Sequence, residues 1–159
     1  MTRVKAFVIF VLSKERNPMK EYEVIVYRNR TEWYNLEGAC HREDAPAIER
    51  KNGGKEWWLD GQLHREDGPA VEKPNGDKEW YLNGKLHRED GPAVEFANGY
   101  KAWWLIDTRH REDGPARVWA DGRKEWYLNG QQLSEEEFNK ITYIAEKSGI
   151  DVSQLRIER

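Results

Sequence analysis

Apolar and polar residues alternate in short runs through the middle of the chain, which is the pattern of half-buried β-strands. One such run is KEWYL at 78–82, and a second run ends in PAVE at 92–95. Each run is followed by an Asn-Gly or Asp-Gly pair, such as Asn83-Gly84 or Asn98-Gly99. These pairs reach the positive φ values of a tight hairpin at little cost. The pattern therefore predicts a continuous antiparallel β-meander.

The two runs belong to a sequence repeat with a period of 23 residues, such as KEWYLNGKLHREDGPAVEFANGY at 78–100. The same interval separates His41, His64, His87 and His110, and also Trp57, Trp80, Trp103 and Trp126. Self-similarity on this scale predicts a mainly β fold, an elongated single-layer sheet to which each repeat adds one hairpin. We expect this repeat sheet to occupy residues 31–133.

The two aromatic residues of each KEWYL-type run should lie on opposite faces of the sheet, because successive strand side chains alternate. The first aromatic is Trp in every run, which suits a packed ridge with Leu59, Leu82, Leu105 and Leu128 beside it. The second aromatic column consists of Tyr34, Trp58, Tyr81, Trp104 and Tyr127. Tyr and Trp tolerate partial exposure and are favoured at interfaces. We therefore predict that the second column binds a partner.

The N-terminal segment, residues 1–30, is predicted to be a β cap that covers the end of the sheet. It contains the apolar run VKAFVIFVL at 4–12, a turn at KERNPMK (14–20) and the run YEVIVY at 22–27. Nearly every residue of the first run is apolar, so we expect burial on both of its sides.

The C-terminal segment, residues 134–159, is predicted to be a helical cap. Ser134 and Glu137 form a capping box, which predicts a helix at about 135–148 that stops near Gly149. Its apolar stripe contains Phe138, Ile141 and Ala145, with Ile144 adjoining. The tail from residue 150 fits a short helix or a strand.

Composition excludes several classes of protein. The formal charge of −3 argues against a basic nucleic-acid-binding face. The single cysteine, Cys40, cannot form an internal disulfide, which favours a reducing compartment. The run at 4–12 is far shorter than the roughly 20 residues that span a bilayer, and no small-residue cleavage site follows it. We expect a soluble cytoplasmic protein.

The segment HREDGPA combines a histidine, an arginine and two acids, and it recurs with HREDAPA as its first copy at 41–47. Repeated copies argue against catalysis, because an enzyme needs one constellation in one pocket. Gly and Pro after the acids predict a bend, and the Asp of each copy is placed to hold that bend by hydrogen bonds to the backbone. Arg and Glu can form ion pairs between neighbouring repeats.

No metal or cofactor site is predicted. Histidines at identical positions of a linear array diverge along its axis, whereas the ligands of one ion must converge. Two adjacent repeats sharing a weakly bound ion through His and an acid is the alternative. Cys40 stands where other repeats have Leu63, Leu86 and Arg109, which favours core packing.

The aromatic-turn-NG layout, the period and the terminal WYLNGQQLSEEEF resemble the MORN repeat (membrane occupation and recognition nexus), in a variant with HREDGPA in its middle. Variants of this kind look like proteins of tailed bacteriophages and some giant viruses. The resemblance implies an open, curved β-meander without catalytic residues or cofactors. It also implies scaffolding or dimerisation, with lipid binding claimed for some members. The fourth repeat departs from the pattern, with Asp107 at the turn glycine and Arg109 at a leucine.

The leading functional hypothesis is a non-catalytic protein–protein interaction module. By resemblance it would be encoded by a phage, act in the host cytoplasm and bind an unidentified host protein, with inhibition of a bacterial defence system as a further step. An aromatic column on each face would leave a large exposed apolar patch unless a partner or a second copy covered it. Dimerisation through the same face is compatible with this hypothesis.

Three other hypotheses remain. The aromatic column could associate with a membrane surface, although balanced charge in the repeats disfavours binding to anionic lipid. Clefts between aromatic rungs could bind a small molecule. An enzyme is disfavoured, because no nucleophile is paired with a base.

Overall fold

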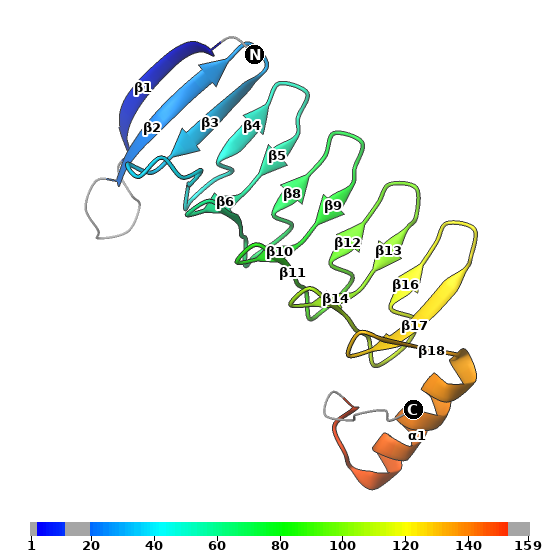
Figure 1. The fold of residues 1–159 in the computed structure, drawn as a ribbon. Helices are drawn as coiled ribbons and strands as arrows, with labels where there is room; N and C mark the ends of the chain where they lie inside the picture. Colours follow the sequence, from blue (N-terminus) through cyan, green and yellow to red (C-terminus); the bar gives the residue numbers. More distant parts are fainter. Residues whose placement is uncertain (1–2, 12–19, 153–159) are drawn as a thin grey trace. The chain divides into compact units, whose positions relative to one another are not determined.

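The computed structural model describes residues 3–11 and 20–152, with side chains from residue 21 to residue 152. The predicted burial of the run at 4–12, most of the predicted turn at 14–20 and the tail from residue 153 lie outside these residues. The protein is mainly β, with antiparallel strands followed by one helix. It forms two compact units, Met1–Lys85 and Leu86–Arg159 (Figure 1). The three-part division of the chain predicted from its sequence remains a prediction.

The N-terminal unit is an antiparallel meander with strand order β1-β2-β3-β4-β5-β8-β9 (Figure 1). These strands are β1 (Arg3–Val11), β2 (Lys20–Tyr27), β3 (Arg30–Tyr34), β4 (Ile48–Arg50), β5 (Lys55–Glu56), β8 (Val71–Glu72) and β9 (Lys78–Glu79). A separate short hairpin joins β6 (Trp58–Leu59) to β7 (Gln62–Leu63). β10 (Tyr81–Leu82) follows, and β11 (Lys85–Leu86) contains the last residue of this unit.

The C-terminal unit repeats this arrangement and ends in the helix. Its sheet strands are β12 (Val94–Glu95), β13 (Lys101–Ala102), β16 (Arg117–Val118), β17 (Lys124–Leu128) and β18 (Gln131–Leu133). β14 (Trp104–Leu105) and β15 (Thr108–Arg109) form the short hairpin. The helix α1 spans Glu135–Ser148.

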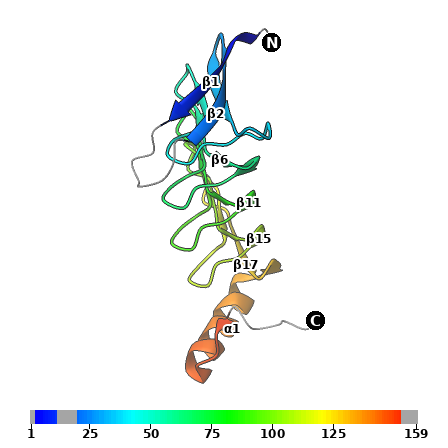
Figure 2. The same cartoon turned by 90° about the vertical axis from the view of Figure 1, so that its left-hand side faces the viewer.

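The first tryptophan of an inner repeat is a corner of the chain and not the middle of one straight strand. Trp57 lies between β5 and β6. Its backbone N–H donates to the Ala70 carbonyl (N···O 2.8 Å), and its own carbonyl accepts from the His64 N–H (3.0 Å). One residue thus joins the main sheet to the short hairpin, and the hairpins labelled β6 and β15 project to the side in Figure 2. The prediction that side chains alternate between two faces along the whole KEWYL-type run is therefore wrong at this corner. In the last run the strand β17 continues unbroken through Trp126.

The arginine of each HRED segment fastens its own loop to that corner. The Arg65 guanidinium lies 4.0 Å from the centroid of the Trp57 ring. Its Nη1 donates to the Pro69 carbonyl (3.2 Å), and its Nε donates to the Asp67 carboxylate (2.8 Å). That hydrogen bond lowers the pKa of the Asp67 carboxyl. The aspartate therefore acts on the bend largely through the arginine, which reaches the backbone.

The glycine of HREDGPA leaves room for this arginine. A Cβ atom on Gly68 would lie 2.9 Å from Cζ of Arg65, closer than real Cβ contacts. The alanine two residues later is fully buried in every copy, as Ala47, Ala70, Ala93 and Ala116. The first copy has Ala45 at the glycine position, and Arg42 there still lies 4.1 Å from the Trp33 centroid, so the buried alanine is the more constant packing feature of the segment.

The histidine of each HRED segment fastens that segment to the short hairpin of the following repeat. Nδ1 of His64 accepts the backbone N–H of Asn83 (3.2 Å), and Nδ1 of His110 accepts that of Asn129 (3.0 Å). Beside the first of these bonds, the Arg65 N–H donates to the Tyr81 carbonyl (3.1 Å). His41 and His87 accept in the same way, from Asp60 (3.1 Å) and Ile106 (3.3 Å). Nδ1 of His41 also lies 2.8 Å from Asp60 Oδ1, and Nδ1 of His64 lies 2.8 Å from Asn83 Oδ1, so these rings contact both the backbone and the side chain of the hairpin tip.

The tip of each short hairpin is left-handed. Asn83 has φ 50° and Gly84 has φ 76°, as a type I′ turn requires. The same turn in the fourth repeat consists of Ile106 (φ 49°) and Asp107 (φ 58°). The left-handed region is strongly unfavourable for a β-branched residue such as Ile106, so the turn of the fourth repeat is strained.

The C-terminal helix follows its predicted capping signals. The Ser134 hydroxyl accepts from the Glu137 N–H (3.2 Å), and the Glu137 carboxylate accepts from the Ser134 N–H (2.8 Å). Gly149 ends the helix with φ 65°. Phe138 packs in a core with Leu128 and Leu133, and Ala145 is also buried. Ile144 is 50% exposed, so it does not belong to the packed face.

The histidine contacts predict a specific loss of stability. His110 is 5% exposed, and His110→Phe keeps a ring of similar size but removes the acceptor for the Asn129 N–H. We expect a loss of about 1–3 kcal/mol in the free energy of unfolding, measured by urea denaturation. An unchanged urea midpoint would show that the bond contributes nothing.

The strained turn predicts the opposite effect. Ile106→Asn should raise the free energy of unfolding by about 1 kcal/mol, because Asn tolerates the left-handed region. The reciprocal change Asn83→Ile, which places a β-branched residue in the equivalent turn of the preceding repeat, should destabilise the protein. Thermal melting of both variants measures the effect, and a lower melting temperature for Ile106→Asn would refute the assignment of strain.

Candidate binding surfaces

The second aromatic column divides between the two units, and all of its members are half-buried. The N-terminal unit holds Tyr34 on β3, Trp58 on β6 and Tyr81 on β10. The C-terminal unit holds Trp104 on β14 and Tyr127 on β17. Part of each ring therefore reaches the surface. Whether these residues bind a partner remains a prediction.

The polar atom of most of these rings is anchored by a glutamate two residues earlier. Nε1 of Trp58 donates to the Glu56 carboxylate (3.0 Å), and the Tyr81 hydroxyl donates to that of Glu79 (3.0 Å). Tyr34 and Tyr127 make the same bond to Glu32 (2.5 Å) and Glu125 (3.1 Å). Burial and the Glu32 carboxylate raise the pKa of Tyr34. Because their polar atoms are occupied, these rings can offer a partner their apolar surface.

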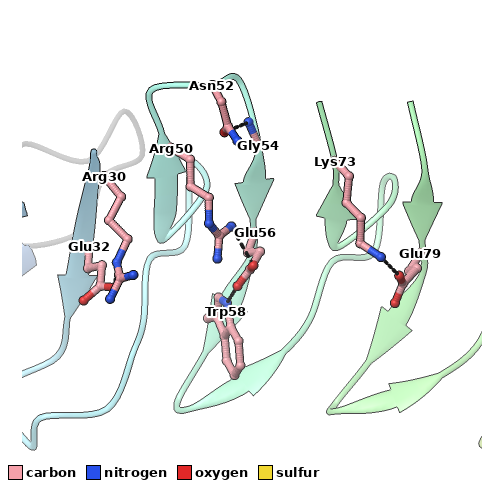
Figure 3. A network of polar contacts seen from close by, with 9 residues as sticks. All are labelled: Arg30, Glu32, Arg50, Asn52, Gly54, Glu56, Trp58, Lys73 and Glu79. Atoms are coloured by element: carbon pink, nitrogen blue, oxygen red, sulfur yellow. Dashed lines mark hydrogen bonds and ion pairs between the residues drawn. The ribbon is translucent and has the colours of Figure 1, made fainter. Parts of the chain in front are cut away.

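In the N-terminal unit, a cation pairs with each of the glutamates Glu32, Glu56 and Glu79 (Figure 3). Arg50 Nη1 lies 2.7 Å from Glu56 Oε1, and Lys73 Nζ lies 2.6 Å from Glu79 Oε1. Arg30 pairs with Glu32 in the same way. Each glutamate therefore bridges a cation and an aromatic ring.

The C-terminal unit has aromatic rings at the positions of two of these cations, and the rings lie around a groove of about 610 Å³. Phe96 and Trp119 stand at the repeat positions of Arg50 and Lys73. The ring centroid of Tyr100 lies 5.2 Å from that of Phe96 and 5.9 Å from that of Trp119. We call this feature the aromatic groove; its lining is Leu86, Val94, Phe96, Asn98, Tyr100, Trp104, Arg117, Trp119, Ala120, Asp121 and Arg123.

Arginines hold the rings of the aromatic groove in place. Arg117 Nε donates to the Tyr100 hydroxyl (2.9 Å), and its Cζ lies 4.3 Å from the Trp119 centroid. Arg123 Cζ lies 5.0 Å from the same centroid. The groove therefore combines aromatic rings with guanidinium groups that lie against them, and both of these arginines also pair with a carboxylate.

The fourth repeat also lacks the glutamate that anchors the second aromatic ring. Ala102 stands where Glu56 and Glu79 stand in earlier repeats. Nε1 of Trp104, which lines the aromatic groove, is buried and has no hydrogen-bond partner among the described residues. The 23-residue pattern alone does not predict the groove, but comparing the repeats position by position would have identified Phe96, Ala102 and Trp119 as departures.

The remaining candidate groups show little reactivity. Burial raises the pKa of the Cys40 thiol to about 12, with the Glu32 and Glu56 carboxylates contributing. The thiolate is the nucleophilic form, so this cysteine is unreactive at neutral pH. Within residues 3–11 and 20–152, no group of three or more His, Cys, Asp or Glu side chains is placed to hold a metal ion. No helix in this part of the chain has the length and hydropathy to cross a bilayer.

Comparison with known proteins does not assign the chain to a family. No family model, no curated protein and no solved structure matches it.

Proposed function

We propose that this protein is a non-catalytic protein-binding module whose contact surface is the second aromatic column. The observation that carries the proposal is that the HRED side chains and the aromatic column of each repeat make different kinds of contact. The histidine and arginine of HRED are engaged in contacts that hold the chain together, such as His64 with Asn83 and Arg65 with Trp57. The column residues are half-buried as well, but the hydrogen bonds of Trp58 and Tyr81 to glutamates engage only the polar atoms of these side chains.

Half-exposed Tyr and Trp rings are well suited to protein contacts. They contribute large contact areas at a small cost in conformational entropy, and they are enriched among the residues that dominate binding energy. The carboxylates of Glu56 and Glu79 already accept the Nε1–H of Trp58 and the hydroxyl of Tyr81, so a partner need not satisfy those donors. The partner predicted by the MORN resemblance is a host protein, with the chain encoded by a phage and acting on a bacterial defence system.

The test is to immobilise this protein, pass a bacterial lysate over it and quantify the lysate proteins that it retains. The double variant Trp58→Ser/Tyr81→Ser should lose a protein that the wild type enriches, and the purified partner should then bind the variant at least about tenfold more weakly by calorimetry. Tyr81→Phe is the matched control, because it keeps the ring and loses only the hydroxyl. β-Sheet circular dichroism confirms that each variant is folded.

A second measurement does not depend on the stability of the serine variant. A photo-crosslinking phenylalanine in place of Tyr81 keeps an aromatic ring there and should form a covalent adduct with the partner. The same amino acid in place of Tyr143, which is 60% exposed on α1, should not. Adducts only from position 143 would contradict the proposal, as would sedimentation of the wild type with anionic liposomes in place of a protein partner.

A further inference from the structure

Departures from the repeat gather around the aromatic groove of the C-terminal unit. The positions of Phe96 and Trp119 carry Arg50 and Lys73 in the N-terminal unit, and the position of Arg117 carries Ile48 and Val71. Tyr100 and Arg123 replace Gly54 and Asp77. All five departing residues, Phe96, Tyr100, Arg117, Trp119 and Arg123, line the same groove. Scaffolding alone does not require this concentration, because the N-terminal unit forms the same hairpins with ion pairs.

The groove contains a hydrogen-bond donor without an acceptor. Nε1 of Trp58 donates to Glu56, but the equivalent Nε1 of Trp104 is buried and unpaired because Ala102 replaces the glutamate. A buried donor without a partner costs about 1–3 kcal/mol. A ligand that brought an acceptor to this atom would recover that free energy.

Arg109, a cation that is not among the lining residues of the groove, lies against the same tryptophan. Arg109 replaces the leucine of other repeats, and its Cζ lies 4.5 Å from the Trp104 centroid and 4.7 Å from the Tyr127 centroid. Its Nε is buried without a hydrogen-bond partner among the described residues, and no carboxylate in this part of the chain pairs with it. Arg117 and Arg123, in contrast, have carboxylate partners in Glu125 and Asp121. The surroundings of Trp104 therefore carry a positive charge that no carboxylate of the described residues pairs with.

These features define the chemical class of a ligand. The groove volume of about 610 Å³ lies in the range of small-molecule sites. Its apolar lining is supplied largely by rings, which favour planar partners. The free donor on Trp104 requires an acceptor, and the charge of Arg109 beside it favours an acceptor that is negatively charged.

We propose that the aromatic groove binds a small planar aromatic anion, whose ring packs against Phe96, Tyr100 and Trp119 and whose anionic group accepts the Trp104 N–H near Arg109. This site shares Trp104 with the protein-binding surface proposed above, but the rings that define it, Phe96, Tyr100 and Trp119, are departures from the repeat that lie outside the second aromatic column. Aromatic sulfonates or carboxylates and nucleoside monophosphates share this chemistry.

The experiment is titration calorimetry of the full chain with naphthalene-2-sulfonate, and separately with adenosine 5′-monophosphate. We expect one of these probes to bind with 1:1 stoichiometry. The neutral analogues, naphthalene-2-methanol and adenosine, should bind at least about tenfold more weakly, because they lack the charge that complements Arg109. Binding of either anion supports the proposal, and the stronger of the two identifies the kind of ring.

Two variants replace residues near Trp104 with those at the same positions of the earlier repeats. Arg109→Leu restores the residue type of Leu63 and Leu86, and Ala102→Glu supplies Trp104 with a carboxylate like that of Glu56. Each variant should lower the affinity for the anionic probe by about tenfold or more. The first removes the cation, and the second occupies the Trp104 N–H and repels the anion. Lys73→Ala, which breaks the ion pair with Glu79 in the N-terminal unit, is the control and should leave binding unchanged.

Three results would overturn the proposal. The first is no heat of binding with either anion, and the second is equal affinity for the neutral analogues. The third is unchanged affinity in Arg109→Leu with its circular dichroism intact. Arg109→Leu places a residue that the repeat accommodates elsewhere, so the variant is expected to fold and the test to be decisive.

Discussion

Most strands of this protein are two residues long, and a ladder of that length cannot hold a sheet together by itself. The fold depends instead on the hydrogen bonds that each HRED segment makes to the short hairpin of the following repeat. In the N-terminal unit, His64 and the Arg65 backbone bind the hairpin at Asn83 and Tyr81. His110 and the Arg111 backbone make the same bonds to Asn129 and Tyr127 in the C-terminal unit. These contacts add a second line of pairing beside the main sheet.

This requirement explains why a segment rich in ionisable residues need not be an active site. The arginine lies over a tryptophan ring, a contact worth about 0.5–2 kcal/mol depending on its exposure. Its remaining donors go to the Pro69 carbonyl and the Asp67 carboxylate, and the loop glycine leaves space for the guanidinium. A histidine whose Nδ1 accepts a backbone N–H of the next hairpin is fixed in place by the fold. The chemical groups of the motif are occupied by the fold, and the same local structure explains why the motif recurs.

The fourth repeat shows how far one repeat can diverge while its neighbours keep it in place. It has a β-branched residue in a left-handed turn, a buried indole N–H without an acceptor and an arginine between two rings. The left-handed turn and the unpaired indole N–H disfavour the folded state, yet the Trp103 backbone still bonds to Ala116 (2.9 Å) and His110 (3.3 Å). Strain and unsatisfied polar groups tend to gather at functional sites, where the surrounding structure sustains them. The aromatic groove has this character.

The sequence by itself determined the β-meander, the left-handed turns and the capped helix, because these depend on local chemistry. An Asn-Gly pair selects its turn wherever it occurs, and Ser134 with Glu137 caps a helix whatever that helix packs against. Only the tertiary structure decided that the KEWYL-type run bends at Trp57. The alternation of residues is the same in a straight run and a bent one, and the bend depends on Ala70 and His64, which are distant in sequence. The aromatic groove was likewise decided in three dimensions, since its rings come from separate hairpins and its unpaired Trp104 N–H results from an alanine two residues earlier.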